Sequence, residues 1–469
     1  MKLSRLIPPL RIAALGFAIL VTLGGLIIAY ENWHGPRALR AEAARLSAQG
    51  ESLDYASYFP PRLPEEKNFM ADPFLQMVDG RRPRDPAFAA AYGEFRKRTD
   101  NYWPLGRTWA QGLLDTVRVN ERGQSHEIPP QEVLGAVASI EPQILRLRRR
   151  AAECSLAQID LGPALMRRDF RGVNTDWDIG EFLQLSRGIA WQAAAESRLG
   201  KNAYAYADAL VLMRMALATK SYPNLLTSIV EIGMVDSLTE LFWQGCLSKS
   251  WSGPELEVFL NFFESAKLGD LSAYDLRAER ALIMTVALTN PGAFFDRKLG
   301  FRRTPLLYLM RFGLTSENAL AAMAGVDDAL GCMDLNKANF DLTKAQTYVS
   351  QRATGWGRTN PYRRLGHLAA TTSLEAVIHE VQVPPGWEVG TIVAALELYH
   401  RAHQDYPTKL EDLVPTYFAR VPTGILAGTP PNYRRIDRAN FRLTSGGPPE
   451  PAWEWHTQIV ASEPASAAR

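Results

Sequence analysis

The sequence predicts a mainly α-helical protein with a single N-terminal transmembrane helix, a helical-hairpin central domain and a small α+β C-terminal domain. Three observations predict this fold class. An uncharged apolar run lies near the start, apolar residues recur three and four apart through the middle, and short aromatic or β-branched runs alternate with glycine and proline near the end. With 469 residues, 46% of them hydrophobic, the protein has enough apolar material for buried cores in two or three domains.

We divide the sequence into six consecutive segments, with boundaries at clusters of proline and glycine that interrupt regular structure. They are a cytoplasmic flank and transmembrane anchor at 1–33, a juxtamembrane helix and Pro-rich connector at 34–83, an α-helical hairpin domain at 84–354, a linker and helix at 355–385, an α+β tail at 386–460, and a disordered end at 461–469.

Residues 12–30 carry the strongest local signal, because none of them is charged. A helix needs about 20 apolar residues to cross the hydrocarbon core of a bilayer. Tyr30 and Trp33 follow the run as interfacial aromatic residues do. A cleaved signal peptide is the alternative, but it needs small residues directly after the run, and the nearest small-x-small triplet is Ala41–Ala43. We therefore expect residues 12–30 to stay in the lipid bilayer as an uncleaved anchor.

The orientation of the anchor depends on the basic residues that flank it. Their numbers are similar on the two sides: Lys2, Arg5 and Arg11 before the run, and Arg37, Arg40 and Arg45 after it. The short N-terminal flank favours a cytoplasmic N-terminus. No second stretch is long enough and free enough of charge to cross the membrane a second time. We expect a single-pass protein of the bacterial inner membrane, with the bulk of the protein periplasmic or otherwise extracytoplasmic.

The charge balance argues against nucleic acid as a partner, since 52 basic and 50 acidic residues leave a net charge of +2. Cys154, Cys246 and Cys332 are odd in number and lie far apart, which excludes a disulfide framework and a paired CxxC metal site. We expect them to be buried free thiols, with a single disulfide as the open alternative.

A polar helix is expected at 38–50, followed by a proline-rich connector at 58–74. Four prolines prevent a continuous helix in the connector, and its aromatic residues anchor it to the rest of the protein. Helices resume around 86–98 and 130–152.

The central segment follows helical periodicity almost throughout. Phe182, Leu185 and Ile189 lie three and four residues apart, and Gly200 ends that helix. Short turns between successive helices indicate antiparallel hairpins. Small and apolar residues of the first pair are spaced as in tetratricopeptide hairpins: Ala194, Leu199–Gly200, Ala203, Ala207 and Leu210. Only one such unit is clear, so a repeat array and an irregular helical bundle both stay open.

The tail begins with a long helix that Tyr406–Pro407 ends. A short helix containing Leu410 and Leu413 should pack back on the long helix. Three strands are then predicted, within 431–437, 440–447 and 452–460.

This tail resembles the C-terminal region of type II secretion pseudopilins of the G class. The matching residues are Ala395–Leu396, Leu398–Tyr399, Tyr406–Pro407, Leu410, Leu413–Val414–Pro415, Tyr417, Val421–Pro422, Tyr433 and Phe441–Leu443. The resemblance implies a long helix covered by a short helix and a small antiparallel sheet. Two departures stand out: Val21 occupies the place of the family's glutamate, and Thr423–Gly424 replaces the usual Asp-Pro, which argues against pilus assembly and the family calcium site.

The order of elements also resembles membrane-anchored proteins of planctomycete and verrucomicrobial genomes. The residues that carry this resemblance are Asn68–Phe69, Ala71, Pro73–Phe74 and the tail. The resemblance implies no particular activity.

Metal-ligating residues gather at the end of the tail helix. Glu397 and His400 have the Glu-x-x-His spacing of carboxylate-bridged metal sites, and His403 and Asp405 follow closely. These four are candidate metal ligands, although the same residues also suit the polar outer face of an amphipathic helix.

No Gly-rich phosphate loop, GxSxG elbow or HExxH motif is present, so the sequence identifies no catalytic residue and implies no cofactor. The sequence therefore favours an envelope scaffold or protein-interaction protein over an enzyme, with an envelope protein as partner. The alternative is an anchored hydrolase or metal-dependent enzyme that uses the histidine-containing tail helix. A weaker option is a secretion-system accessory protein that docks on pseudopilin-like surfaces.

Overall fold

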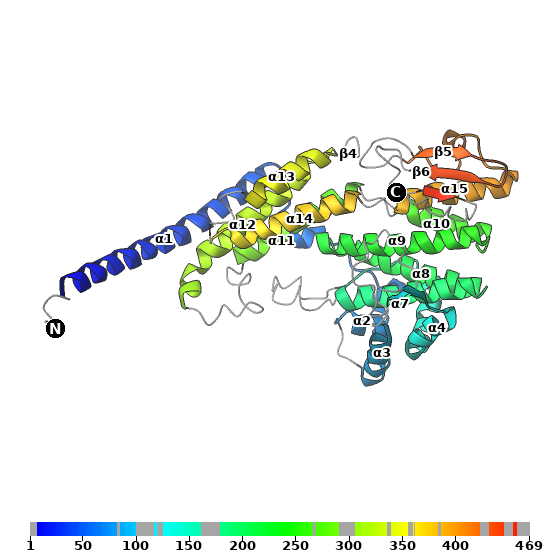
Figure 1. The fold of residues 1–469 in the computed structure, drawn as a ribbon, viewed down its shortest axis with the longest axis horizontal. Coiled ribbons are helices and arrows are strands. Elements are labelled where there is room, and N and C mark those ends of the chain that lie inside the picture. The colour runs from blue at the N-terminus through cyan, green and yellow to red at the C-terminus, as the bar shows by residue number, and fades with distance from the viewer. Residues whose placement is uncertain are drawn as a thin grey trace, which may run out of the picture. The chain divides into compact units, whose positions relative to one another are not determined.

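The computed structural model confirms that the protein is mainly helical, with one long apolar N-terminal helix (Figure 1). It describes residues 7–81, 85–99, 117–119, 125–160, 179–265, 269–289, 305–334, 339–354, 360, 362–382, 386–422, 431–444 and 454–456. The predicted disordered end at 461–469 lies outside these residues.

Contacts divide the protein into two compact units, and each unit joins segments that lie far apart in the sequence. Unit 1 consists of Met1–Tyr58, Leu276–Gly331 and Thr343–Glu375. Unit 2 consists of Phe59–Asp275, Cys332–Leu342 and Ala376–Arg469.

Unit 1 begins with α1 (Ile7–Ala48), the one helix in the described residues that is long and apolar enough to span a membrane. Its apolar side chains from Leu15 to Ile27 are uncovered, and Phe17 and Leu20 are about 70% exposed. The polar helix predicted at 38–50 is the continuation of α1 and not a separate helix. A single helix therefore runs from the apolar segment into the packed part of unit 1.

Four more helices contribute to unit 1: α11 (Gly269–Thr289, from Leu276 onward), α12 (Pro305–Gly331), α13 (Leu342–Thr354) and α14 (Arg364–Gln382, up to Glu375). The polar half of α1 packs along α12. Leu39 and Leu46 of α1 are buried there against Met284, Ala319 and Met323. Arg280 of α11 pairs with Glu51 and Asp327, so polar contacts border this small core.

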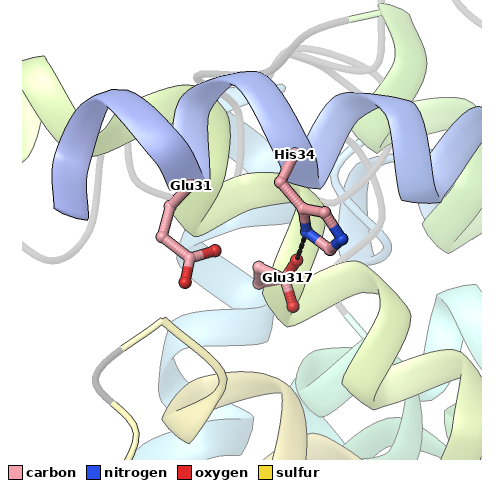
Figure 2. A group of neighbouring side chains, drawn as sticks. All are labelled: Glu31, His34 and Glu317. Carbon is pink, nitrogen blue, oxygen red and sulfur yellow. Dashed lines mark ion pairs between the residues drawn. The ribbon is translucent and has the colours of Figure 1, made fainter. Parts of the chain in front are cut away.

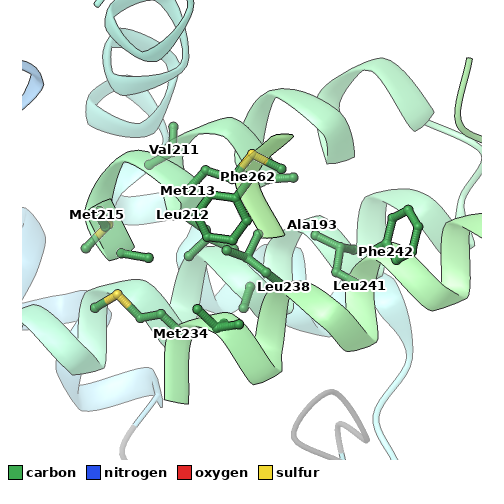
Figure 3. Close-up of a cluster of buried hydrophobic side chains, with 14 of the residues drawn as sticks. Ala193, Val211, Leu212, Met213, Met215, Met234, Leu238, Leu241, Phe242 and Phe262 are labelled. Atoms are coloured by element: carbon green, nitrogen blue, oxygen red, sulfur yellow. The ribbon is translucent and has the colours of Figure 1, made fainter. Parts of the chain in front are cut away.

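Unit 2 stacks successive helices around a larger core. Its helices before the tail are α2 (Pro73–Val78), α3 (Pro86–Thr99), α4 (Pro130–Val137), α5 (Glu141–Glu153), α7 (Ile179–Arg198), α8 (Asn202–Thr219), α9 (Leu225–Leu247) and α10 (Gly253–Ser265). Gly200 ends α7 with a left-handed φ of 71°, and Asn224 forms a capping box at the start of α9. Figure 3 shows side chains of α7, α8, α9 and α10 meeting in the core, among them Leu212, Leu238 and Phe262.

A 3-10 helix at Tyr55–Tyr58 precedes the proline-rich connector, and the connector itself contains two more, at Glu65–Lys67 and Phe69–Ala71. Phe69 and Phe74 are fully buried, as expected for anchor points. The Asn68 amide donates to the backbone oxygen of Gln158 at 2.9 Å, and its oxygen accepts from the Gln158 backbone N–H at 2.8 Å. These two hydrogen bonds fix the connector to the segment that contains Gln158. They satisfy backbone polar groups that no long helix or strand satisfies there.

The tail of unit 2 combines α15 (Gly386–His403), the short helix η10 (Leu410–Leu413) and a three-stranded antiparallel sheet. Its strands are β5 (Asn432–Arg435), β6 (Phe441–Thr444) and β7 (Glu454–His456), in the order β5-β6-β7. Each strand lies within a predicted range. Leu410 and Leu413 are buried in the core to which α15 contributes. The described residues contain two further antiparallel strand pairs, β1 (Val117–Val119) with β2 (Ser125–Glu127) and β3 (Met333–Asp334) with β4 (Asn339–Phe340).

A buried acid in the first turn of α15 predicts a pH dependence of stability. Glu388 is 4% exposed, its Oε1 accepts no hydrogen bond from the described residues, and burial raises its pKa from 4.5 to about 8. A raised acid pKa means that the folded state holds the proton more tightly. The contribution of Glu388 to stability is therefore fully retained below pH 4.5 and falls as the pH rises toward 8.

We expect Glu388→Gln to raise the free energy of unfolding at pH 8 by several kcal/mol, at about 1.4 kcal/mol per pKa unit. Near pH 4.5 the substitution should change little. Denaturant unfolding across this range measures the difference from wild type. Glu257→Gln on the exposed face of α10 is the control, and a pH-independent difference for Glu388→Gln would contradict the assignment.

Candidate functional site

A pocket of about 390 Å³ lies in unit 2 between the end of α9, the start of α10, the end of α15 and the turn before β6. Its walls carry both indole rings and ionisable groups. The lining residues include Cys246, Lys249, Trp251, Glu397, His400, Arg401, Gln404 and Tyr406. The volume falls in the range typical of small-molecule and side-chain binding pockets.

The end of α9 builds the first wall. Lys249 adopts a left-handed φ of 54°, and the N–H of Ser250 donates to the Gly245 oxygen at 2.8 Å, which closes the helix end. The backbone then returns Trp251 over the helix, where its indole Nε1 donates to the Phe242 oxygen at 2.7 Å. Only glycine fits at position 245, because a Cβ there would lie 1.9 Å from Trp251 Cε2.

The end of α15 builds the second wall. Gln404 ends the helix with a left-handed φ of 55°, and its N–H donates to the His400 oxygen at 2.7 Å. The backbone turns back so that the Tyr406 hydroxyl donates to Glu397 Oε1 at 2.6 Å. The His400 ring stacks on Tyr406 with 4.4 Å between ring centroids. Tyr406 in turn meets the edge of Phe441 in β6, which fixes its position.

The charges of the pocket are mainly basic. Lys249 and Arg401 contribute two cations, and the Arg401 guanidinium also donates to the backbone oxygen of Trp251. Among the described residues that line the pocket, Glu397 is the one with a carboxyl group. Burial raises the pKa of Glu397, and the Tyr406 hydrogen bond opposes that rise. Aromatic walls with two cations suit a ligand that combines an apolar part with a carboxylate.

The Cys246 thiol also faces this pocket, but it is not activated as a nucleophile. Burial, and then the nearby Glu397, raise the pKa of the thiol well above 9.0. The thiolate is the reactive form of cysteine, so a thiol of this kind is almost entirely protonated at neutral pH. The arrangement can bind a ligand, but Cys246 is not the low-pKa cysteine that covalent catalysis uses.

The four candidate metal ligands from the sequence have different surroundings. Glu397 and His400 line the pocket. The His403 ring stacks on the Tyr399 ring, and His403 Nδ1 lies 3.0 Å from the backbone oxygen of Tyr399. Asp405 pairs with Arg435 of β5 at 2.9 Å. Each of these contacts is local to the tail, and zinc binding by the set stays a prediction.

No local pattern in the sequence marks the other pocket residues as a site. Lys249 and Trp251 come from the turn after α9, about 150 residues before Arg401, whose guanidinium bonds the Trp251 backbone. The Gly245–Trp251 spacing around a helix end is the only local signal, and it indicates packing and not binding.

A comparison of the protein with protein-family models, curated proteins and solved structures found no match in any of the three. The tetratricopeptide and pseudopilin resemblances therefore stay predictions from the sequence.

The raised thiol pKa predicts slow alkylation of Cys246. With iodoacetamide, the midpoint of the pH–rate profile at Cys246 should lie above 9.0, measured by mass spectrometry of its peptide in the intact protein. Glu397→Gln should lower that midpoint, because the Glu397 carboxylate contributes to the rise. Glu257→Gln should leave it unchanged. Rapid modification at pH 7 would instead indicate an activated thiol.

Proposed function

We propose that this protein is a membrane-anchored interaction protein of the bacterial envelope. In this proposal α1 holds the protein in the inner membrane, and unit 2 binds a segment of an extracytoplasmic partner protein in the pocket beside α15. The observation that carries the proposal is the chemistry of this pocket, in which indole rings and two cations surround a thiol of raised pKa.

The uncovered apolar side chains of α1 support the anchor. Side chains such as Phe17 and Leu20 are left uncovered by the described part of the protein, which is unfavourable in water. A helix of this length and hydropathy is stable in a bilayer, where its backbone hydrogen bonds are all internal. The sequence around the anchor favours a cytoplasmic N-terminus, so we propose that both units lie outside the cytoplasm.

The partner segment should carry a carboxylate next to an apolar side chain. Lys249 and Arg401 can pair with the carboxylate, and the Trp251 indole offers an apolar surface beside them. Lys249 and Arg401 outnumber Glu397, the one carboxyl group among the described residues that line the pocket, and the Tyr406 hydroxyl already donates to one of its oxygens. The terminal carboxylate of a partner protein, or an Asp or Glu beside an apolar residue, has this chemistry.

The alternative is an anchored hydrolase, and it rests on Glu397 and His400 lining the same pocket. His400 is stacked on Tyr406, and Glu397 accepts from the Tyr406 hydroxyl, so both groups have partners within the tail. These contacts favour a binding role for the two residues. Turnover that depends on His400 would favour the enzyme.

The proposal predicts that a partner can be crosslinked from the pocket. A photoreactive amino acid at Gln404, which lines the pocket, should capture a discrete partner band in intact cells. The same amino acid at Ala402, which is also exposed but does not line the pocket, should capture much less. Lys249→Gly removes a cation and also relieves the left-handed backbone, so it should weaken capture from Gln404 without lowering stability.

Equal capture from positions 402 and 404 would contradict the proposal. Undiminished capture in the Lys249→Gly protein, shown to be folded by thermal unfolding, would remove the role of the pocket cation. Substrate turnover by the purified protein that Glu397→Gln and His400→Ala abolish would replace the proposal with the enzyme alternative.

A further inference from the structure

A second group of ionisable side chains lies in unit 1, apart from the pocket. Figure 2 shows Glu31 and His34 on α1 facing Glu317 on α12. One ligand atom from each of the three side chains lies within 4.8 Å of the other two. Among the described residues this is the group of histidine, cysteine and acidic side chains whose geometry suits a metal ion.

The sequence brings these side chains together through a close approach of α1 and α12. Glu31 and His34 are three residues apart, so they share one face of α1. Gly313 faces them from α12, and a Cβ at that position would lie 2.9 Å from the backbone carbon of Glu31. Asn32 fixes the register, because its Nδ2 donates to the Leu309 oxygen at 2.6 Å and its Oδ1 accepts from the Gly313 N–H at 2.8 Å.

Glu317 is the buried member of the group, with a side chain that is 2% exposed. Its Oε2 accepts from Arg363 Nε at 2.7 Å, which orients the carboxylate. Its Oε1 is buried and accepts no hydrogen bond within the part of the protein that the structure describes. A buried carboxylate oxygen without a hydrogen bond is costly, and an unsatisfied oxygen that faces a histidine nitrogen and a second carboxylate suits a cation.

The distances fit a metal ion of the size of zinc. Zinc binds histidine nitrogen and carboxylate oxygen at about 2.0–2.2 Å, so two ligands in a tetrahedral site lie roughly 3.4 Å apart. His34 Nδ1 and Glu317 Oε1 are already 3.4 Å apart (Figure 2). Glu31 offers a third ligand atom within 4.8 Å of the other two, and the partly exposed His34 side chain leaves access for a fourth ligand such as water.

We propose that Glu31, His34 and Glu317 bind one divalent transition metal ion of the zinc class. One imidazole and two carboxylates form a borderline to hard ligand set, which zinc, manganese and iron(II) all accept. Arg363 and the Tyr30 ring, which stacks on His34 at 5.3 Å between centroids, support the ligands from outside. The ion joins α1 to α12 immediately after the apolar run at 12–30. This inference is independent of the proposed partner pocket.

The test uses the full-length protein, without an affinity tag, purified in detergent and stripped of metal with a chelator. Titration with Zn²⁺ alone should give one bound ion per protein molecule. His34→Ala and Glu317→Gln should each raise the dissociation constant more than about tenfold, since even residues that only support metal ligands contribute 10- to 100-fold. Zn²⁺ should also raise the thermal midpoint of the wild type and not that of His34→Ala.

The protein supplies its own matched control. Glu397 and His400 repeat the Glu-x-x-His spacing on α15, so Glu397→Gln with His400→Ala should leave the stoichiometric zinc site intact. His34 is partly exposed, and the metal-free His34→Ala protein should therefore keep the helical content and thermal midpoint of the metal-free wild type. Zinc binding that persists unchanged in folded His34→Ala, or that the α15 double variant abolishes, overturns the proposal. No stoichiometric binding by the wild type also overturns it, since Glu317 and His34 then form only an ion pair.

Discussion

The side chain of Asn32 joins α1 to α12 in unit 1 through two hydrogen bonds. Its side-chain amide donates to the Leu309 backbone oxygen and accepts from the Gly313 N–H. In an ordinary α-helix these two backbone groups are hydrogen-bonded to each other. Asparagine can do this because its amide has a donor and an acceptor side by side. The absence of a Cβ at Gly313 gives the space, and the two bonds together allow only one register of α1 on α12.

This register has consequences in both directions along α1. Toward the N-terminus, the apolar residues are uncovered and suited to lipid, and the helix continues from them without a break. Toward the C-terminus, Leu39 and Leu46 enter the core of unit 1. The helix suited to the membrane is thus part of a folded unit and not a flexible tether. Unit 2 has its own core and a pocket formed by the ends of α9 and α15, where we propose that a partner binds.

Local patterns in the sequence predicted the local structure well, and the long-range contacts poorly. The absence of charge at 12–30 predicted the apolar part of α1, and the spacing of Phe182, Leu185 and Ile189 predicted α7. Asn32 and His34, by contrast, look like ordinary polar residues after a membrane span. Their partners lie on α12, Gly313 is 281 positions after Asn32 in the sequence, and no helical periodicity encodes that pairing. The pocket is similar, since Trp251 and Tyr406 come to line it only through tertiary packing.

The central claim is that α1 packs on α12 in one fixed register beyond its apolar segment, and a cysteine pair tests it most directly. A Cβ at Gly35 would lie 3.1 Å from the Ser316 Cβ, close to the separation of about 3.8 Å that a disulfide requires. We expect Gly35→Cys with Ser316→Cys to form a disulfide in native membranes under mild oxidation, detected as a linked peptide by mass spectrometry. Arg37→Cys with Ser316→Cys, displaced by two residues along α1, should not link. Equal yields from the two pairs, or no link from the first, would contradict a fixed register.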